Sequence, residues 1–313
     1  MSLASGILIT GVGGFVGRHL VKELTGLGCP IFGIGSNDLD PGQAESLDDY
    51  IKCDLRREWP TVPSVGGVVH LAGLSAVGPS FDDPQRYIDS NSAIMTHLGE
   101  YYLQSGDRPR TLVVSSGAIY DADQPLPIAE SGRLAFDSPY AVSKLLVEAQ
   151  SSYYARRGLD CVIVRPFNHI GPGQGPGFLL PDLLSGAQAA VSGSEELVVG
   201  DLETERDYSD VRDVTHAYRL LLEAEVVDAD VVNVCSGQSV AGRTILQIML
   251  DTLQKEIKVR VDPERIRPTD PRRIAGDNST LRRLTGWAPR FTLEQTISDF
   301  ISHSTRTDGL RDA

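Results

Sequence analysis

Apolar residues are grouped in short runs through the first half of the chain, separated by longer mixed segments. The runs cover residues 6–10, 30–36, 51–55, 65–73 and 111–117, and a sixth begins at 161. The first run is β-branched, bounded by glycine and too short for a helix, which is typical of a buried strand in a parallel sheet. We interpret the other runs as further strands of the same sheet.

The segments between these runs carry apolar residues at helical spacing. After Gly17, one helical face is formed by Leu20, Val21, Leu24 and Leu27. A second helix is expected to open at residues 82–84, with a stripe formed by Ile88, Asn91, Met95 and Leu98. Ser138 and Pro139 predict the start of a third, because serine caps a helix and proline suits its first position. The alternation predicts an α/β fold, a doubly wound parallel sheet of the Rossmann type.

Three glycines join the first strand to the first helix. Gly11, Gly14 and Gly17 have the spacing at which a tight turn needs positive φ, the backbone approaches a pyrophosphate, and helix packs closely on strand. The helix start then offers unpaired N–H groups to the phosphates. The alternative is a glycine-rich turn that binds nothing, but the flanking strand and helix both favour the dinucleotide site.

Composition narrows the class of protein. The chain has 313 residues, 41% of them hydrophobic, and a formal net charge of −13, which disfavours nucleic acid as a partner. We expect no membrane span and no signal peptide, and hence a cytoplasmic protein. The four cysteines and six histidines are scattered, so no metal site is predicted.

The end of the second strand bears on the choice of cofactor. Dinucleotide folds place an acidic residue there for the ribose 2′-hydroxyl, whereas this chain has Ser36 in the sequence Gly35-Ser36-Asn37. Without the carboxylate a 2′-phosphate is not repelled, and Arg18 is a candidate counter-charge. We therefore predict NADP(H), with NAD(H) possible if Asp38 or Asp40 takes the acid's place.

Other candidate cofactor contacts lie at later strand ends. Asp54 is placed to meet the adenine or cap a loop, and the small Ala72 and Gly73 admit a flat ligand or suit tight packing. Asn91 is an amide on an apolar stripe, so it needs partners and has either a binding or a local structural role. Besides the three glycines, the expected cofactor contacts are Phe15, Val16, Ser36, Asp54, Leu55, Leu71, Ala72, Gly73, Asn91, Tyr140 and Lys144.

The candidate chemistry lies at the third helix. Tyr140 and Lys144 are four residues apart and share a helix face, and Ser116 ends the fifth strand. A phenol has a pKa of about 10, and each unit of lowering requires ~1.4 kcal/mol. We predict that Lys144 lowers the pKa of Tyr140, which exchanges a proton with an oxygen held by Ser116. The alternative is an amphipathic helix with a surface lysine.

These motifs together resemble the extended short-chain dehydrogenase/reductases, over a range from the first strand to about Phe300. The resemblance implies that Ser116, Tyr140 and Lys144 are the catalytic set and that a smaller C-terminal domain holds a nucleotide-sugar. The ribose acid is missing, and Asp121 stands where the family usually has glycine after Tyr120.

The domain limits follow from that resemblance. We expect a dinucleotide-binding domain over 1–165, rejoined by about 206–238, and an α/β substrate-binding domain over 166–205 and 239–302. Residues 303–313 are expected to form a frayed polar tail. The family also implies a homodimer through a four-helix interface, made by the helices around 88–103 and 140–154.

The second half supplies candidate substrate contacts. Asn168 follows the sixth strand, and Arg206, Arg265 and Arg267 are placed to meet a pyrophosphate, although surface ion pairs would explain them equally. Segments 167–174, 232–237 and 285–289 are most similar to the branch of the family that reduces GDP-4-dehydro-6-deoxy-D-mannose. That similarity implies NADPH-dependent reduction of a 4-keto group, giving GDP-D-rhamnose.

Three other activities were weighed. Dehydratases of this family need an acid and a base after the strand-five hydroxyl, where this chain has Gly117 and Ala118. A nucleotide-sugar 4-epimerase with tightly held NAD stays open, although the absent ribose carboxylate favours a reductase that exchanges its cofactor. A non-catalytic NADP(H) sensor is the third, and the intact Ser116, Tyr140 and Lys144 disfavour it.

Overall fold

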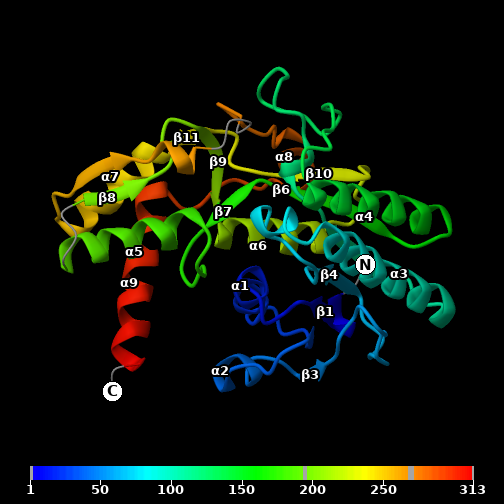
Figure 1. Cartoon of the computed structure of the whole chain (residues 1–313). Coiled ribbons are helices and arrows are strands. Elements are labelled where there is room, and N and C mark those ends of the chain that lie inside the picture. Colours follow the sequence, from blue (N-terminus) through cyan, green and yellow to red (C-terminus); the bar gives the residue numbers. More distant parts are fainter. Residues whose placement is uncertain (1–2, 193–195, 267–270, 312–313) are drawn as a thin grey trace.

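The structure is a computed structural model that describes residues 3–192, 196–266 and 271–311. A large parallel sheet with helices on both faces forms one lobe, and a smaller α/β lobe lies beside its upper edge (Figure 1). None of the helices in these ranges combines the length and apolar character needed to cross a membrane.

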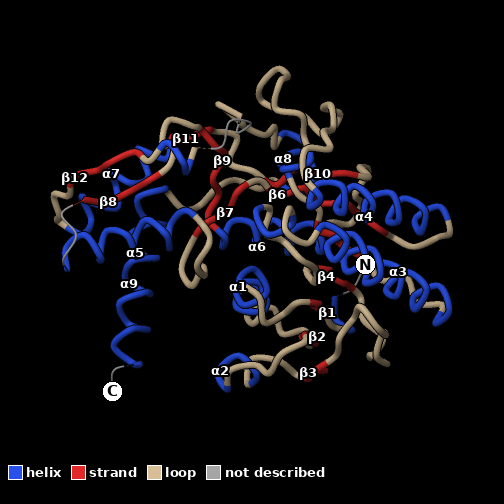
Figure 2. The backbone as a smooth tube through the Cα atoms, viewed as in Figure 1, coloured by secondary structure: helices blue, strands red, loops and turns tan. Residues whose placement is uncertain are grey.

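Seven parallel strands form the large sheet in the order β10-β6-β5-β4-β1-β2-β3 (Figure 2). They are β1 (Ile7–Thr10), β2 (Ile31–Gly35), β3 (Asp49–Lys52), β4 (Gly67–His70), β5 (Arg110–Val114), β6 (Cys161–Pro166) and β10 (Val231–Val234). The order runs outward in both directions from β1, which confirms the predicted doubly wound sheet.

Alternate residues along β1 pack into two different hydrophobic cores. Ile7 and Ile9 pack with α1 (Phe15–Leu24) and α6 (Val211–Glu223), whereas Leu8 packs with α3 (Pro84–Ser105) and α4 (Pro139–Arg156). This alternation is the period of two expected for a strand that is covered on both faces. The sheet is thereby covered by helices on both faces.

The smaller lobe has its own core. Its strands are β7 (Asn168–Ile170), β8 (Glu196–Val199), β9 (Glu205–Asp210), β11 (Ser239–Ala241) and β12 (Lys258–Val261), paired as β11-β9-β7 and β12-β8. The helices are α5 (Leu179–Ser192), α7 (Gly242–Leu253) and α9 (Leu293–Arg311). Between them, α6 and β10 return to the large lobe, and α2 (Pro41–Ala44) and α8 (Ser279–Thr285) complete the fold.

Several element ends differ from the sequence prediction. The strand expected over 65–73 is only four residues long, and α1 ends at Leu24, which leaves Leu27 outside the helix and 38% exposed. The short strand β7 was not foreseen. Helix α9 continues to Arg311, through most of the segment expected to be a frayed tail.

Candidate functional site

A cavity of about 1280 Å³ opens between the large sheet and the smaller lobe. It follows the carboxyl ends of the first six strands, where open α/β sheets bind their ligands. Of the predicted site residues, those that line it are Gly11, Gly14, Phe15, Val16, Gly17, Ser36, Asp54, Leu55, Leu71, Ala72, Gly73, Ser116, Tyr140, Lys144 and Asn168.

The glycine turn forms one end of this cavity. Gly11 has φ +70°, and a Cβ there would lie 2.9 Å from the Ala72 nitrogen. A Cβ at Gly17 would lie 2.4 Å from the Val12 oxygen. Gly14 is the N-cap of α1, and no side chain caps this helix. The first N–H groups of α1 are thus available for an anion, and the close backbone packing fits a dinucleotide diphosphate.

The end of β2 carries both acidic and basic groups. Strand β2 ends at Gly35, so Ser36 occupies the predicted place and lines the cavity with Asp38. Lys52 forms an ion pair with Asp38 at 2.8 Å, and Arg18 lies 3.3 Å from Asp40. Both acids are therefore paired with a cation, and of the two cations Arg18 also lines the cavity with Ser36.

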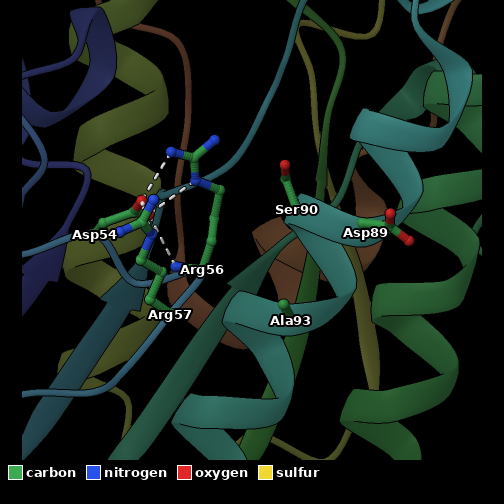
Figure 3. Close-up of a pocket in the computed structure, with 6 residues that line it drawn as sticks. All are labelled: Asp54, Arg56, Arg57, Asp89, Ser90 and Ala93. Carbon is green, nitrogen blue, oxygen red and sulfur yellow. Dashed lines mark hydrogen bonds and ion pairs between the residues drawn. The ribbon is translucent and has the colours of Figure 1, made fainter.

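Asp54 lies just after the end of β3, and its carboxylate is held by a neighbouring arginine. Its carboxylate accepts two hydrogen bonds from the Arg56 side chain, both 2.8 Å long. These bonds hold the pKa of Asp54 below its usual value. A small side cavity of about 300 Å³ lies here, with Asp54, Arg56 and Arg57 facing the α3 residues Asp89, Ser90 and Ala93 (Figure 3).

Asn91 does not line the large cavity but supports its wall. It is 2% exposed, and its Oδ1 accepts a 2.8 Å hydrogen bond from the Leu74 nitrogen. Its Nδ2 donates to the Leu74 oxygen and to Ser143 Oγ, at 3.2 and 3.0 Å. The amide therefore fixes the loop after β4 and joins α3 to α4, the structural role that was left open.

Tyr140 and Ser116 both line the cavity. Ser138 caps α4 by accepting a 3.1 Å bond from the Ala141 nitrogen, and this places Tyr140 in the first turn. The Tyr140 phenol is 5% exposed, and the Ser116 hydroxyl lies close enough to act on its pKa. Burial raises the pKa of Tyr140 to about 12, against the lowering effect of Ser116.

Lys144 lies beside this pair without lowering the pKa of the phenol. Its ammonium is 6.0 Å from the centre of the Tyr140 ring and donates a 2.9 Å hydrogen bond to the Val114 oxygen. Burial lowers the pKa of Lys144 to about 8. Our expectation that Lys144 lowers the pKa of Tyr140 is therefore wrong for the protein by itself, because desolvation of the phenol dominates.

The predicted arginines are not gathered in the cavity. Arg206 lies on β9 and donates to the Glu205 and Pro271 oxygens at 2.9 and 2.7 Å, and it does not line the cavity. Arg265 donates to the Val198 oxygen at 2.8 Å. Arg267 lies outside the described residues. Asn168 is the predicted substrate contact that does line the cavity.

The loop between β7 and α5, which sequence reasoning did not assign to the site, also lines the cavity. Residues Gly173, Gln174, Gly175, Gly177 and Phe178 line it. The loop is fastened to α1, because His19 hydrogen-bonds the Pro172 oxygen at 2.8 Å and Phe15 stacks on His169. These contacts join residues about 150 positions apart, and no local motif announces them.

Two further residues that line the cavity were missed by sequence reasoning. Arg86 of α3 and Tyr218 of α6 both line it. Each comes from a helix whose periodicity marks only its apolar face, so neither carried a signal of its own.

Comparisons with known proteins agree with this architecture. The family model described as GDP-mannose 4,6 dehydratase matches residues 8–300. The GDP-6-deoxy-D-mannose reductase of Pseudomonas aeruginosa is 34% identical over 302 residues, covering 95% of this chain and 96% of that protein.

Two solved structures have the same fold. The structure of RMD from Pseudomonas aeruginosa complexed with NADPH has a TM-score of 0.79 at 32% identity, covering 96% of this chain and 99% of that one. A UDP-glucose-4-epimerase from Stenotrophomonas maltophila, with bound NAD and formylated UDP-arabinopyranose, has a TM-score of 0.86 at 25% identity, covering 99% and 100%. Enzymes with different activities therefore share this arrangement.

Proposed function

The chain belongs to the GDP-mannose 4,6-dehydratase family, and we propose that it is an NADPH-dependent reductase of the 4-keto group of a nucleotide-sugar. The substrate proposed is GDP-4-dehydro-6-deoxy-D-mannose, and the product GDP-D-rhamnose. The observation that carries this proposal is that Ser116 and the buried Tyr140 and Lys144 line the same cavity as the glycine turn.

The state of Tyr140 suits reduction. When bound, the cofactor supplies the hydride that adds to the carbonyl carbon. A phenol with a pKa of about 12 is protonated at neutral pH, so Tyr140 is available to donate the proton to the developing alkoxide. The Ser116 hydroxyl beside it would hold the carbonyl oxygen. Lys144, charged below about pH 8, would stabilise the phenolate left behind and bind the nicotinamide ribose.

The residues beside Ser116 separate reduction from dehydration. Gly117 and Ala118 follow Ser116 in a single helical turn, and Ala118 lines the cavity. Neither has a group that transfers a proton, which water elimination requires. The family name therefore describes the fold and cofactor chemistry of this chain better than its reaction.

Two further features support NADPH and a reductase over an epimerase. Ser36 stands directly after β2 and lines the cavity together with Arg18, the candidate partner for a 2′-phosphate. The reductase from Pseudomonas aeruginosa is also the more similar relative, at 34% identity. An epimerase is still represented among the structural relatives, with NAD bound.

The assay of choice uses purified protein, GDP-4-dehydro-6-deoxy-mannose and NADPH. We expect loss of NADPH absorbance and one equivalent of GDP-deoxyhexose for each NADPH consumed. Interconversion of UDP-hexoses without added cofactor would instead establish the epimerase. Binding of NADPH without turnover of either substrate would establish the sensor.

The remaining assignments are part of this proposal. Asn168 is the proposed contact to the nucleotide-sugar, held by the smaller lobe as substrate-binding domain. Arg206 is not kept as a contact, because it bonds the Glu205 and Pro271 oxygens and does not line the cavity. Arg267 stays a prediction.

A homodimer through α3 and α4 is supported by Leu146 and Tyr153, which are 37% and 48% exposed on α4. Sedimentation analysis of the Leu146→Glu variant tests the dimer. We also propose a cytoplasmic location.

A further inference from the structure

A side chain of α1 holds the loop between β7 and α5. His19 lies on α1, and its Nε2 is 2.8 Å from the Pro172 oxygen, in a partly buried contact. A carbonyl oxygen only accepts hydrogen bonds, so the ring must donate through Nε2. Burial lowers the pKa of His19, so the imidazole is neutral at neutral pH and its one N–H group is used in this bond.

This bond joins the two lobes. In Figure 1 the loop hangs from the smaller lobe beside α1, although the bonded residues are 153 positions apart in the sequence. Other bonds of the loop stay within the smaller lobe: Gln174 Nε2 donates to the His169 oxygen at 3.1 Å, and the Gly177 nitrogen donates to Asp182 of α5 at 2.9 Å. The bond from α1 therefore fixes the loop from the opposite side.

The composition of the loop makes such outside contacts important. Residues 172–177 are three glycines, two prolines and one glutamine. Glycine loses more conformational freedom on ordering than any other residue, so a contact that fixes this loop offsets a large entropy cost. Because the loop also lines the cavity, its placement shapes the end of the cavity that the smaller lobe forms.

His19 itself does not line the cavity, so it would act on a ligand through its neighbours. One neighbour is the loop. The other is Phe15, whose ring centre is 5.5 Å from that of His19 and which stacks on His169 at 6.1 Å. An effect transmitted through Phe15 would reach the dinucleotide, whereas an effect transmitted through the hydrogen bond would reach the sugar end.

We infer that His19 is a positioning residue for the nucleotide-sugar, although it lies on the helix that begins at the glycine turn. Its hydrogen bond to Pro172 holds the loop between β7 and α5 in the form that receives the sugar. This inference rests on the proposed function, since it requires a nucleotide-sugar at that end of the cavity. It gives α1 a role in sugar binding in addition to its role at the dinucleotide.

Two substitutions of His19 separate the hydrogen bond from the bulk of the side chain. His19→Gln keeps an N–H donor near the place of Nε2, whereas His19→Leu keeps an apolar side chain and removes the donor. His216 provides a control on α6, because it bonds Glu23 of α1 at 2.9 Å. His216→Leu therefore removes a histidine bond to the same helix without touching the loop.

The experiment measures kcat and KM for GDP-4-dehydro-6-deoxy-mannose and the dissociation constants of NADPH and of GDP-mannose, which has no 4-keto group to reduce. We expect His19→Leu to raise KM and weaken GDP-mannose binding roughly 3- to 10-fold, the effect of one neutral hydrogen bond. Its kcat and NADPH affinity should stay level. His19→Gln should restore most of the lost affinity, and His216→Leu should change none of these constants.

Wild-type affinity for GDP-mannose in His19→Leu would overturn the inference while leaving the proposed function intact. Equal losses in His19→Leu and His19→Gln would overturn it too, since the bond would not be the cause. Equal weakening of NADPH and GDP-mannose, or a loss of the same size in His216→Leu, would contradict it by placing the effect on α1 as a whole. If the wild-type protein neither binds GDP-mannose nor reduces the 4-keto sugar, the proposed function fails and this inference fails with it.

Discussion

The two ends of the cavity are built from different parts of the chain. At the dinucleotide end the wall is largely backbone: the glycine turn, the uncapped start of α1 and the small residues after β4. At the sugar end it is formed by the side chain of Asn168 and by the 173–178 loop, which is fastened to α1 through His19.

This difference predicts how each end responds to change. A backbone cradle has no spare volume, so one added carbon displaces it, whereas a wall of side chains and loop residues adapts. Substitutions at the dinucleotide end should therefore be tolerated poorly. We also expect relatives to bind similar dinucleotides there. The sugar end should lose affinity in small steps, and the activity should be set there and at the junction of the two ends.

The largest effect is expected at the junction of the two ends, where Ser116, Tyr140 and Lys144 line the cavity. Tyr140→Phe removes the proton donor and should lower kcat roughly 10²- to 10⁴-fold, the range for a general acid. NADPH affinity should change little, since the ring and its packing are kept. Steady-state assays and NADPH titration on the same preparation check this. Wild-type turnover in the variant would show that another group donates the proton.

The next effect is expected at the dinucleotide end. A Cβ at Gly17 would lie 2.4 Å from the Val12 oxygen, so Gly17→Ala must displace the turn. Overpacking of this kind costs about 1–3 kcal/mol, which corresponds to roughly 5- to 150-fold weaker NADPH binding if the cost falls on the binding conformation.

Gly26 supplies the control for that change. A Cβ there meets nothing within 4 Å, and its φ is not in the left-handed region. Gly26→Ala, just beyond α1, should leave NADPH affinity unchanged. Equal affinities in the two variants would contradict a rigid backbone cradle.

The pH profile probes the junction through Lys144. Burial lowers the pKa of Lys144 to about 8, so its positive charge is present below that pH and is lost above it. We expect kcat/KM to fall about tenfold per unit above pH 8, as a required cation is lost. The unfolding free energy should move the other way, rising between about pH 8 and the ordinary lysine pKa of 10.5, because a neutral amine is easier to bury.

The buried His70 cannot account for a fall in activity above pH 8. Burial lowers the pKa of His70 to about 3, so it stays neutral across the assay range. A profile flat to pH 9 would contradict the role given to Lys144. A break near pH 6 would point to a different histidine.

The contrast between the ends also explains what the sequence could predict. Gly11, Gly14 and Gly17 lie within one strand-turn-helix unit, and Tyr140 and Lys144 lie within one turn of a helix, so spacing alone places them. The residues after the strands can be placed in the same way, because the carboxyl ends of parallel strands lie at one edge of the sheet. The doubly wound sheet and the dinucleotide end were therefore predictable.

Contacts set by long-range packing were not predictable. The His19 bond to Pro172 depends on how the smaller lobe docks, and Arg206 is directed by its bonds to Glu205 and Pro271. The pKa of Tyr140 was misjudged for a related reason. Spacing identifies a lysine as its neighbour, but only the packed structure shows how completely the phenol is desolvated.

The smallest effect is expected at the sugar end. Asn168 is an exposed side chain at the start of β7, so Asn168→Ala removes at most one or two neutral hydrogen bonds to the nucleotide-sugar. We expect KM for that substrate to rise roughly 3- to 10-fold while NADPH affinity stays the same. The Asn168→Asp variant keeps the size and adds a negative charge, so it should raise KM further if a phosphate is the group bound. A change in NADPH affinity as large as the change in KM would show that the two ends are not independent, because the wall between them would then move as one unit.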